Sequence, residues 1–319
     1  MPKVSVVIPT KGRPALLMRA IDSVLAQTMA DVEVVVVIDG HDPETTARLA
    51  TVTDRRVRVC QNATSRGSGK ARNIGAWRAE GDWIAFLDDD DVWLPRKLER
   101  QLAACPGVRR VIVTCLSAFV TPLGTTIRPR EPFSGQEPID EWLFDRRRLF
   151  GGGAFLQTSS LLMPRELFLE LGFPGHSQHE DWEFAIRAVK FGGISLLTVP
   201  EDLVRHHAEE ERPSLSQSGT VRRSLEWIDR MRGAVTQRAY SGFCLTVIAH
   251  HAARNGDWRI FMPLLVRAFR FGRPTGLQLA VYLLTWFMPR KLHKLLRRLR
   301  PLAGTGALER SLPAGGETA

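Results

Sequence analysis

Four consecutive aspartates, Asp88 to Asp91, follow an apolar run, Ile84 to Leu87, within the stretch WIAFLDDDDVW. Carboxylates in a row repel one another, so a buried strand that brings them to one point requires a compensating cation. A divalent metal that carries phosphates is the simplest, because Mg²⁺ and Mn²⁺ prefer hard oxygen ligands and are usually held by one or two carboxylates plus a substrate. The alternative is a solvated acidic turn in which an aspartate caps a helix starting near Leu94. For an isolated cluster the solvated turn is preferred, so the other motifs decide.

A second acidic group lies in the sequence HEDWE, residues 179–183, which opens a predicted helix continuing to Gly192. Acidic residues in a first helical turn complement the helix dipole, so an isolated Glu-Asp pair has a purely structural explanation. The sequence Arg205-His206-His207 follows late apolar strands. Histidines bind metals, but surface histidines without a ligand are the commoner case. Neither motif establishes a site by itself.

The elements that position these residues begin at the N-terminus. Val4 to Ile8 is a continuous apolar run typical of a buried parallel strand, and Val32 to Ile38 is a second one. Between them, apolar residues from Leu16 to Leu25 recur at helical spacing. A strand, a helix and a strand form a right-handed parallel unit, and ligands bind such sheets at the carboxyl ends of the strands. Thr10 and Asp39 both lie at those ends.

The following segments continue the alternation of strands and helices that is expected of an α/β protein. Further strands are predicted at 56–60, 84–87, 111–118, 194–199 and 203–204. Helices are predicted after the stretch 66–73, ending at about Glu80, from 94 to 102 and from 180 to 192. A hairpin is predicted around residues 122–124, where Pro-Leu-Gly interrupts the apolar pattern.

The glycine-rich stretch Arg66 to Asn73 resembles two nucleotide-binding motifs and matches neither. A phosphate-binding P-loop requires Gly at position 64 and Ser or Thr at position 71, where this chain has Thr64 and Ala71. A dinucleotide fingerprint requires a third glycine where Arg72 stands, and it belongs in the first strand-to-helix turn. A dehydrogenase is therefore excluded.

The net charge of +10 is concentrated near the C-terminus. Residues 222–300 carry 16 Lys and Arg against 3 Asp and Glu, whereas residues 1–221 carry 27 against 29. Because the larger part of the chain is nearly neutral, a nucleic-acid partner has little support. The four cysteines are scattered without metal or redox spacing, and the chain enters its first strand without a signal segment, which predicts a cytoplasmic setting.

Three regions are predicted: a catalytic domain at 1–220, a basic helical region at 221–300 and a disordered tail at 301–319. Residues 275–288 form an apolar run of about 14 residues, shorter than the ~20 that a membrane-spanning helix needs. A leucine stripe within 291–300 is surrounded by Lys and Arg, which is typical of a helix lying on an anionic membrane. The sequence predicts peripheral membrane contact through 275–300, on the inner face. The alternative is an ordinary helical cap with a solvated basic face.

Seven motifs in order carry a resemblance to glycosyltransferase family 2. They are VSVVIPTKGRP, VVVIDG, GSGKARNIG, GDWIAFLDDDDVW, TSSLLMP, HEDWEFAIR and VRHH with the later SLS. Each is weak alone, but the ordered set is specific, and it spans Val4 to about Ser216, two-thirds of the chain. The resemblance implies the GT-A fold, which is an α/β, Rossmann-like, mixed and mainly parallel sheet flanked by helices. The C-terminal helical extension lies outside it.

This resemblance implies an inverting transfer of a sugar from a nucleotide-sugar donor, most often a UDP-sugar, to an acceptor hydroxyl. The setting would be cell-surface polysaccharide or glycolipid assembly, with a saccharide or lipid-linked acceptor. By this resemblance, the nucleotide would be held by Pro9, Thr10, Asp39, Arg72, Asp88 and Asp89. Asp39 would accept a hydrogen bond from the base, and Arg72 would lie near the pyrophosphate or the base.

The same resemblance assigns the metal and the general base. Asp90 would bind a divalent metal, Mn²⁺ or Mg²⁺, and Asp181 would remove the proton of the acceptor hydroxyl. Either His206 or His207 would complete metal binding, and the Arg-x-His spacing of the family favours His207. The chemistry is consistent on its own terms, because a metal neutralises a departing diphosphate and a positioned carboxylate typically contributes ~10²–10⁴-fold to rate.

Two rival functions remain open. A nucleotidyltransferase shares the nucleotide and metal requirement, but it usually has a Gly- and Arg-rich loop after the first strand, where this chain has PTKGRP. A non-catalytic protein that retains the fold predicts degraded acidic motifs, whereas both motifs are intact here. Slow hydrolysis of UDP-sugars in the presence of Mn²⁺ separates the three alternatives.

Overall fold

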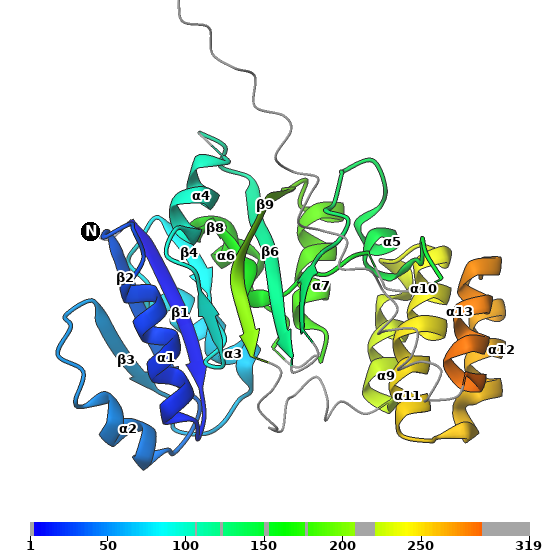
Figure 1. Ribbon diagram of the computed structural model, residues 1–319, viewed down its shortest axis with the longest axis horizontal. Helices are drawn as coiled ribbons and strands as arrows, with labels where there is room; N and C mark the ends of the chain where they lie inside the picture. Colours follow the sequence, from blue (N-terminus) through cyan, green and yellow to red (C-terminus); the bar gives the residue numbers. More distant parts are fainter. Residues whose placement is uncertain are drawn as a thin grey trace, which may run out of the picture.

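The computed structural model describes residues 3–105, 107–121, 124–149, 153–175, 178–207 and 221–288, with the side chain of His207 outside this description. A mixed sheet of nine strands forms the centre of the molecule, in the order β3-β2-β1-β4-β8-β6-β9-β5, with β7 paired to β6 (Figure 1). The strands comprise β1 Val4–Thr10, β2 Val32–Ile38, β3 Val57–Gln61, β4 Trp83–Phe86, β5 Asp91–Trp93, β6 Val111–Thr121, β7 Gly124–Arg128, β8 Leu162–Pro164 and β9 Ser195–His207. The predicted α/β, mixed and mainly parallel sheet is confirmed.

The N-terminal half of the sheet is parallel and is buried on both faces. All seven residues of β1 and of β2 are buried, as expected for strands made of continuous apolar runs. Successive side chains point to opposite faces, so Val6 and Ile8 enter one hydrophobic core while Val7 enters the other. The helices that cover the two faces comprise α1 Pro14–Leu25, α2 Pro43–Leu49, α3 Ser68–Arg78, α4 Lys97–Ala103, α6 Arg165–Leu171 and α7 Glu180–Ile186.

The second half of the sheet reverses direction at β8, which runs antiparallel to both β4 and β6. The two late strands predicted at 194–199 and 203–204 are one strand, β9, with register shifts opposite Leu116. The predicted hairpin is present, because β6 and β7 pair as antiparallel neighbours on either side of residues 122–123.

The region after the aspartates differs from the prediction of a helix starting near Leu94. Residues 91–93 form the short strand β5, which pairs with β9, and α4 begins only at Lys97. The physical reason is Pro95, which disfavours the helical conformation in the residue before it, so Leu94 stays extended. Its backbone N–H donates to the carbonyl of Leu203, 3.0 Å away.

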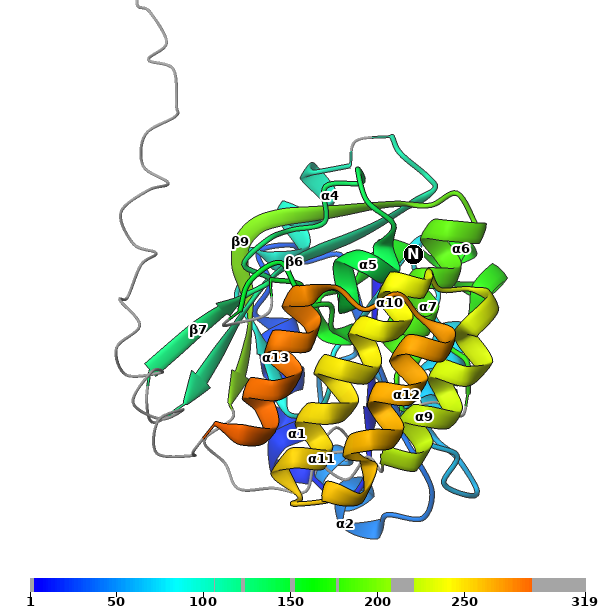
Figure 2. The same ribbon diagram turned by 90° about the vertical axis from the view of Figure 1, so that its right-hand side faces the viewer.

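The C-terminal helices form a layer that packs beside α7 and α5 (Ile139–Phe144), at one end of the sheet (Figure 2). They comprise α9 Val221–Arg230, α10 Gln237–Gly242, α11 Ala249–Arg254, α12 Phe261–Phe271 and α13 Gly276–Phe287, with a π-helical stretch, η4 Phe243–Ile248, that joins α10 to α11. One hydrophobic core runs without interruption from β1 to α13. The predicted domain boundary at residue 220 therefore stays a prediction, because it rests on the change in amino-acid composition there.

No helix within the described ranges has both the length and the apolar character that are needed to cross a bilayer. The predicted interfacial helix within 291–300 and the tail at 301–319 lie outside the described residues.

Candidate functional site

The first part of the site forms where β1 and β4 end. The hydroxyl of Thr10 donates to a carboxylate oxygen of Asp89, 2.8 Å away, and Arg13 forms ion pairs with Asp89 at 2.6 Å and with Asp90 at 3.2 Å. The carboxyl of Asp89 is 1% exposed. Burial raises the pKa of Asp89 to about 7, although the neighbouring Arg13 and Thr10 act in the opposite direction. The structure thus brings the predicted Thr10 and Asp89 into direct contact.

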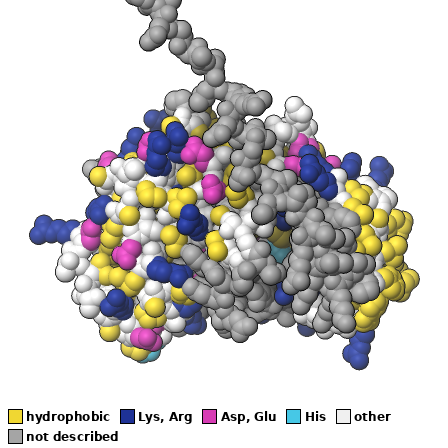
Figure 3. Space-filling view, in the orientation of Figure 1, with side chains coloured by type: hydrophobic (Ala, Val, Ile, Leu, Met, Phe, Trp, Pro, Cys, Tyr) yellow, Lys and Arg dark blue, Asp and Glu magenta, His cyan; other side chains and the backbone are white. Residues whose placement is uncertain are grey.

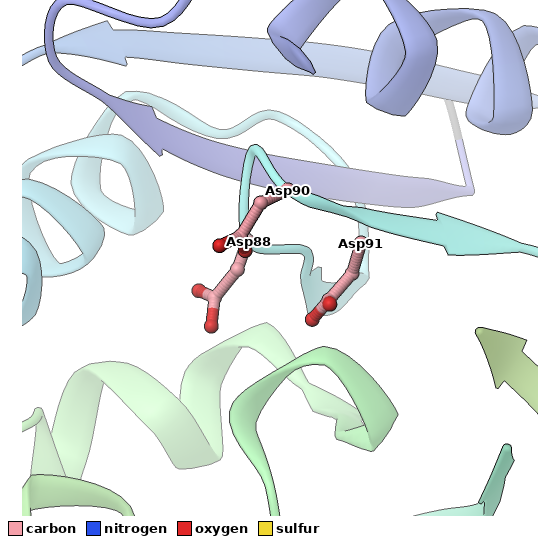
Figure 4. A group of neighbouring side chains, drawn as sticks. All are labelled: Asp88, Asp90 and Asp91. Atoms are coloured by element: carbon pink, nitrogen blue, oxygen red, sulfur yellow. The ribbon is translucent and has the colours of Figure 1, made fainter. Parts of the chain in front are cut away.

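Asp88, Asp90 and Asp91 place carboxylate oxygens within 4.8 Å of one another. Figure 4 shows the three side chains leaving the turn between β4 and β5 on the same side. Carboxylates are hard oxygen donors, so this donor set suits Mg²⁺ or Mn²⁺ better than a soft metal. The donor set therefore fits a divalent cation, and Asp88 and Asp90 are the less deeply buried of the three candidate ligands.

Asp91 is buried and is held in place by three neighbours. Its Oδ2 atom accepts hydrogen bonds from Ser159 at 2.6 Å and from Gln157 at 3.0 Å, while Oδ1 lies 2.5 Å from Nδ1 of His206. The same Ser159 hydroxyl accepts the backbone N–H of Asp88 at 3.0 Å. This network fixes the turn that carries the aspartates.

His206 lies opposite Asp91 in the pairing of β5 with β9, and its ring stacks on Phe119 with centroids 4.5 Å apart. Since Nδ1 faces a carboxylate oxygen, Nδ1 carries the proton, and a neutral ring then has its lone pair on Nε2. The Nε2 atom is buried and has no hydrogen-bond partner among the described residues. A carboxylate that orients a histidine in this way is common behind metal ligands. The assignment of metal binding to His207 stays a prediction.

Arg72 joins the two acidic motifs. It lies in α3, is 5% exposed, and its guanidinium reaches Asp88 and Glu180 at 2.5 Å each. Burial alone would lower the pKa of Arg72, but these carboxylates raise it above its ordinary value. Ser68 also donates to Glu180, at 2.9 Å. A Cβ atom on Gly69 would lie 2.1 Å from Oε2 of Glu180, so a side chain at this position would require the Glu180 carboxylate to move away from its contacts with Arg72 and Ser68.

Asp181 follows in the first turn of α7 and is partly buried. One of its oxygens accepts the backbone N–H of Trp182 at 2.8 Å. Burial is the main cause that raises the pKa of Asp181 to about 7, and the negative charges of Glu180 and Asp88 add to it. A carboxylate with such a pKa is a stronger base than an ordinary aspartate, and it is still largely ionised slightly above neutrality.

Asp39 organises the loop after β3. Its two oxygens accept hydrogen bonds from the side chains of Asn62 at 3.0 Å and Ser65 at 2.8 Å and from the backbone N–H groups of Arg66 and Gly67 at 2.9 Å each. Burial would raise the pKa of Asp39, but these donors lower it below its ordinary value, so the group stays ionised. The predicted contact of Asp39 with a base remains a prediction.

Pro9 is also among the residues predicted to hold the nucleotide. It is buried in β1, where it pairs in register with Val37 of β2. It therefore lies one residue before Thr10, at the same end of the sheet as the acidic turn.

Arg13, Glu180 and Asp91 were given no individual role by the resemblance. Arg13 contacts Asp89, Glu180 contacts Arg72, and Asp91 contacts His206, the alternative metal ligand. A signal existed for Arg13 and Glu180, because both stand inside motifs of the family. No sequence signal indicated that Asp91 and His206 would be paired, since that contact depends on the register between β5 and β9.

Two solved structures that superpose on most of the chain have the same architecture. TarS residues 1–349 from S. aureus, in complex with UDP-GlcNAc, superposes with a TM-score of 0.56 at 20% identity, covering 85% of this chain and 74% of that one. The mannosyltransferase PcManGT from Pyrobaculum calidifontis, in complex with GDP-Man and Mn²⁺, gives a TM-score of 0.57 at 16% identity, covering 90% and 87%. These similarities define the class of fold, the GT-A fold of glycosyltransferases.

The sequence profile described as "Glycosyl transferase family 2" matches residues 5–172, more than half of the chain. The chain therefore belongs to glycosyl transferase family 2. Among curated relatives, the amylovoran biosynthesis glycosyltransferase AmsB of Erwinia amylovora is 27% identical over 245 residues, covering 73% of this chain and 79% of its own. The Escherichia coli UDP-Glc:alpha-D-GlcNAc-diphosphoundecaprenol beta-1,3-glucosyltransferase WfgD is 35% identical over 100 residues, covering 31% and 40%.

Proposed function

We propose that this protein is an inverting glycosyltransferase that moves a sugar from a nucleoside-diphosphate donor, a UDP-sugar in the first instance, to an acceptor hydroxyl. The observation that carries the proposal is the Arg72 bridge, which joins Asp88 to Glu180 and so brings two acidic motifs about 90 residues apart in sequence to one site. One motif suits the donor diphosphate, and the other supplies a carboxylate of raised pKa for the acceptor.

On the donor side, Asp88 and Asp90 would hold a divalent cation, which neutralises charge on the leaving diphosphate when it is bound. Thr10 and Arg13 orient Asp89, and Arg13 also reaches Asp90. The nucleotide would extend from this turn over the ends of β1 and β2, where Pro9, Thr10 and Asp39 lie, because ligands of such sheets bind at the carboxyl ends of strands.

On the acceptor side, Asp181 would accept the proton of the hydroxyl as that oxygen attacks the anomeric carbon and the bond to the diphosphate breaks. Its pKa of about 7 suits this role, because a general base is most effective when its pKa lies near the working pH. Glu180, which is bonded to Arg72 and Ser68, would position the turn that carries Asp181.

We further propose that the acceptor is a saccharide or a lipid-linked saccharide of cell-surface polysaccharide or glycolipid assembly. The relatives support this, since AmsB is described as acting in amylovoran biosynthesis and WfgD as acting on a diphosphoundecaprenol-linked sugar. The reaction would then take place in the cytoplasm at the inner face of the membrane, with membrane contact through 275–300.

The test is a donor screen that measures nucleoside diphosphate released from UDP- and GDP-sugars with Mn²⁺, with Mg²⁺ or with EDTA. We expect slow hydrolysis of one donor that requires the metal. Asp181→Asn should bind that donor normally and turn over at least about a hundredfold more slowly. The matched control is Glu166→Gln, which removes an exposed acid from the first turn of α6. Full turnover by Asp181→Asn, or hydrolysis that EDTA does not affect, would refute the proposal.

A further inference from the structure

Helix α12 exposes an apolar ridge. Met262, Val266 and Phe269, at a spacing of four and then three residues, are 58%, 56% and 61% exposed. They share one face of the helix, because residues three and four apart are neighbours on a helix surface. The opposite side of α12 packs against η4 through Leu264 and Ala268, which are fully buried. The ridge is therefore the outer side of a well-packed helix.

Helix α13 and the turn before α12 extend this ridge. Leu283 and Phe287 of α13 are 47% and 63% exposed, and Trp258 is 51% exposed. The Trp258 ring lies 4.8 Å from that of Trp286 and 5.6 Å from that of Phe287, so an aromatic corner forms where α12 begins and α13 ends. Figure 3 shows the resulting band of hydrophobic atoms along the right-hand edge, over α12 and α13. We call this band the outer face; it consists of Trp258, Met262, Val266, Phe269, Leu283 and Phe287.

The charged residues next to the outer face in sequence are mostly basic, although the exposed Asp257 directly precedes Trp258. Residues 258–300 contain ten Lys and Arg and no Asp or Glu. Arg259 and Arg270 are exposed beside Trp258 and Phe269, and Arg273 is exposed just after α12. Arg267 also belongs to this group of ten, and the other six follow α13 in the sequence, within 290–300. An apolar band whose neighbouring exposed charges are mostly cations is complementary to a surface that is apolar inside and anionic outside.

We propose that the outer face docks on an anionic lipid surface. Contiguous exposed apolar surface usually marks an interaction site, and tryptophan favours the boundary between lipid and water. Helix α13 has 12 residues and is about 18 Å long, so it would lie along the surface instead of crossing the ~30 Å hydrocarbon core. The biological purpose of docking rests on the proposed function, because docking would bring the enzyme to a lipid-linked acceptor. The proposed membrane contact is thereby extended from 275–300 to α12 and Trp258.

The experiment is sedimentation of the full-length chain with vesicles made of equal parts of phosphatidylglycerol and phosphatidylcholine, and with vesicles of phosphatidylcholine alone. The outer-face variant combines Met262→Gln, Val266→Gln and Phe269→Gln. The control variant combines Val59→Gln, Leu169→Gln and Phe191→Gln, which replace side chains of similar exposure elsewhere on the molecule. Because all six side chains are exposed, both variants should fold.

We expect the wild type and the control variant to bind the anionic vesicles, to bind less in high salt, and to leave pure phosphatidylcholine largely unbound. The outer-face variant should bind at least about a thousandfold more weakly, since burial of each of its three replaced side chains changes the binding equilibrium by about tenfold or more. Donor hydrolysis without vesicles should be the same in all three proteins, which separates failure of docking from failure of the proposed transfer reaction.

Equal binding by the outer-face variant and the wild type would overturn the proposal. Absence of binding to anionic vesicles at low salt would also overturn it. A wild type that ignores vesicles and elutes as a dimer, with a monomeric outer-face variant, would assign the face to self-association instead. A second variant, with Arg259→Gln, Arg270→Gln and Arg273→Gln, should lose part of the preference for phosphatidylglycerol, and an unchanged preference would remove the electrostatic part of the argument.

Discussion

Replacement of Asp181 by Asn should make the protein more stable at neutral pH while it removes the proposed base. The folded structure raises the pKa of this carboxyl from 3.8 to about 7, mainly because the group is withdrawn from water and secondarily because Glu180 and Asp88 are negative. The charged form is therefore less favourable in the folded protein than in the unfolded chain. An amide of the same shape carries no charge and avoids this cost.

The magnitude follows from the size of the shift. Three pKa units at about 1.4 kcal/mol each correspond to about 4 kcal/mol of stability. The sign is that of a carboxyl whose folded pKa is raised. The contribution of this carboxyl to stability is complete below pH 4, is lost progressively as pH rises from about 4 to 7, and does not change further above pH 7. Asp181→Asn lacks this dependence, so its advantage should grow across that window and become constant above it.

The assay is urea unfolding of the wild type and Asp181→Asn at several pH values between 5 and 8, with Glu166→Gln as the control. Both substituted residues are first-turn acids, but Glu166 is exposed, so its variant should follow the wild type closely. The same preparations provide turnover, which in the wild type should rise as Asp181 ionises through about pH 7. Asp181→Asn should combine higher stability with very low turnover.

Parallel curves of unfolding free energy against pH for the wild type and Asp181→Asn would refute the reasoning. They would mean that this carboxyl titrates alike in the folded and unfolded chains, so that it is neither desolvated nor a base of raised pKa. A less stable Asp181→Asn at pH 8 would show instead that the charged form is stabilised by the fold, and Asp181 would then be a structural anion of α7.

Three further perturbations test other parts of the site and core. Asp90→Asn should weaken donor binding by about tenfold or more with Mn²⁺ and little without it, and calorimetry that shows equal loss in both would exclude a metal role. Gly69→Ala should lower the unfolding free energy by about 1–3 kcal/mol, since its Cβ would meet Glu180, and unchanged urea unfolding would contradict this. Burial lowers the pKa of Lys97 to about 8. Lys97→Met should therefore raise the unfolding free energy by about 1 kcal/mol at pH 7, because it relieves about 3 kcal/mol of desolvation but loses the hydrogen bond to Gln101. Because wild-type stability rises as Lys97 neutralises above pH 8, that advantage should shrink by pH 10, and a constant difference in unfolding free energy would refute it.

The parallel part of the sheet was predictable because its strands are unbroken apolar runs. Val32–Ile38 has the predicted bounds, and the first strand differs only by its extension to Thr10. Continuous apolar runs of this length are typical of strands that are buried on both faces of a sheet. The carboxyl ends of these strands then place Thr10 beside the acidic turn. Here local pattern and tertiary position agree.

The less predictable features depend on pairing between distant segments. Strand β5 has only three residues and forms because it pairs with the edge of β9. The local sequence pattern around residues 91–93 does not indicate this pairing. The same pairing buries Asp91 against His206, so the fourth aspartate of a run that looks uniform has a different role from the other three. Asp39 is similar, because the loop that saturates its oxygens lies more than 20 residues further along the chain.

The position of the proposed base depends on helices to which the sequence assigned no chemistry. His179 precedes the acidic pair, its ring is parallel to that of Trp182 with centroids 4.9 Å apart, and its Nε2 atom lies 2.9 Å from the hydroxyl of Ser224 in α9. Burial lowers the pKa of His179 to about 3, so the ring is neutral and packs as an aromatic group. The indole N–H of Trp227, also in α9, donates to Glu183 of α7 at 2.9 Å. Helix α9 therefore fixes α7 on both sides of the turn that carries the base, and a change in the C-terminal layer should reach the chemistry through this contact.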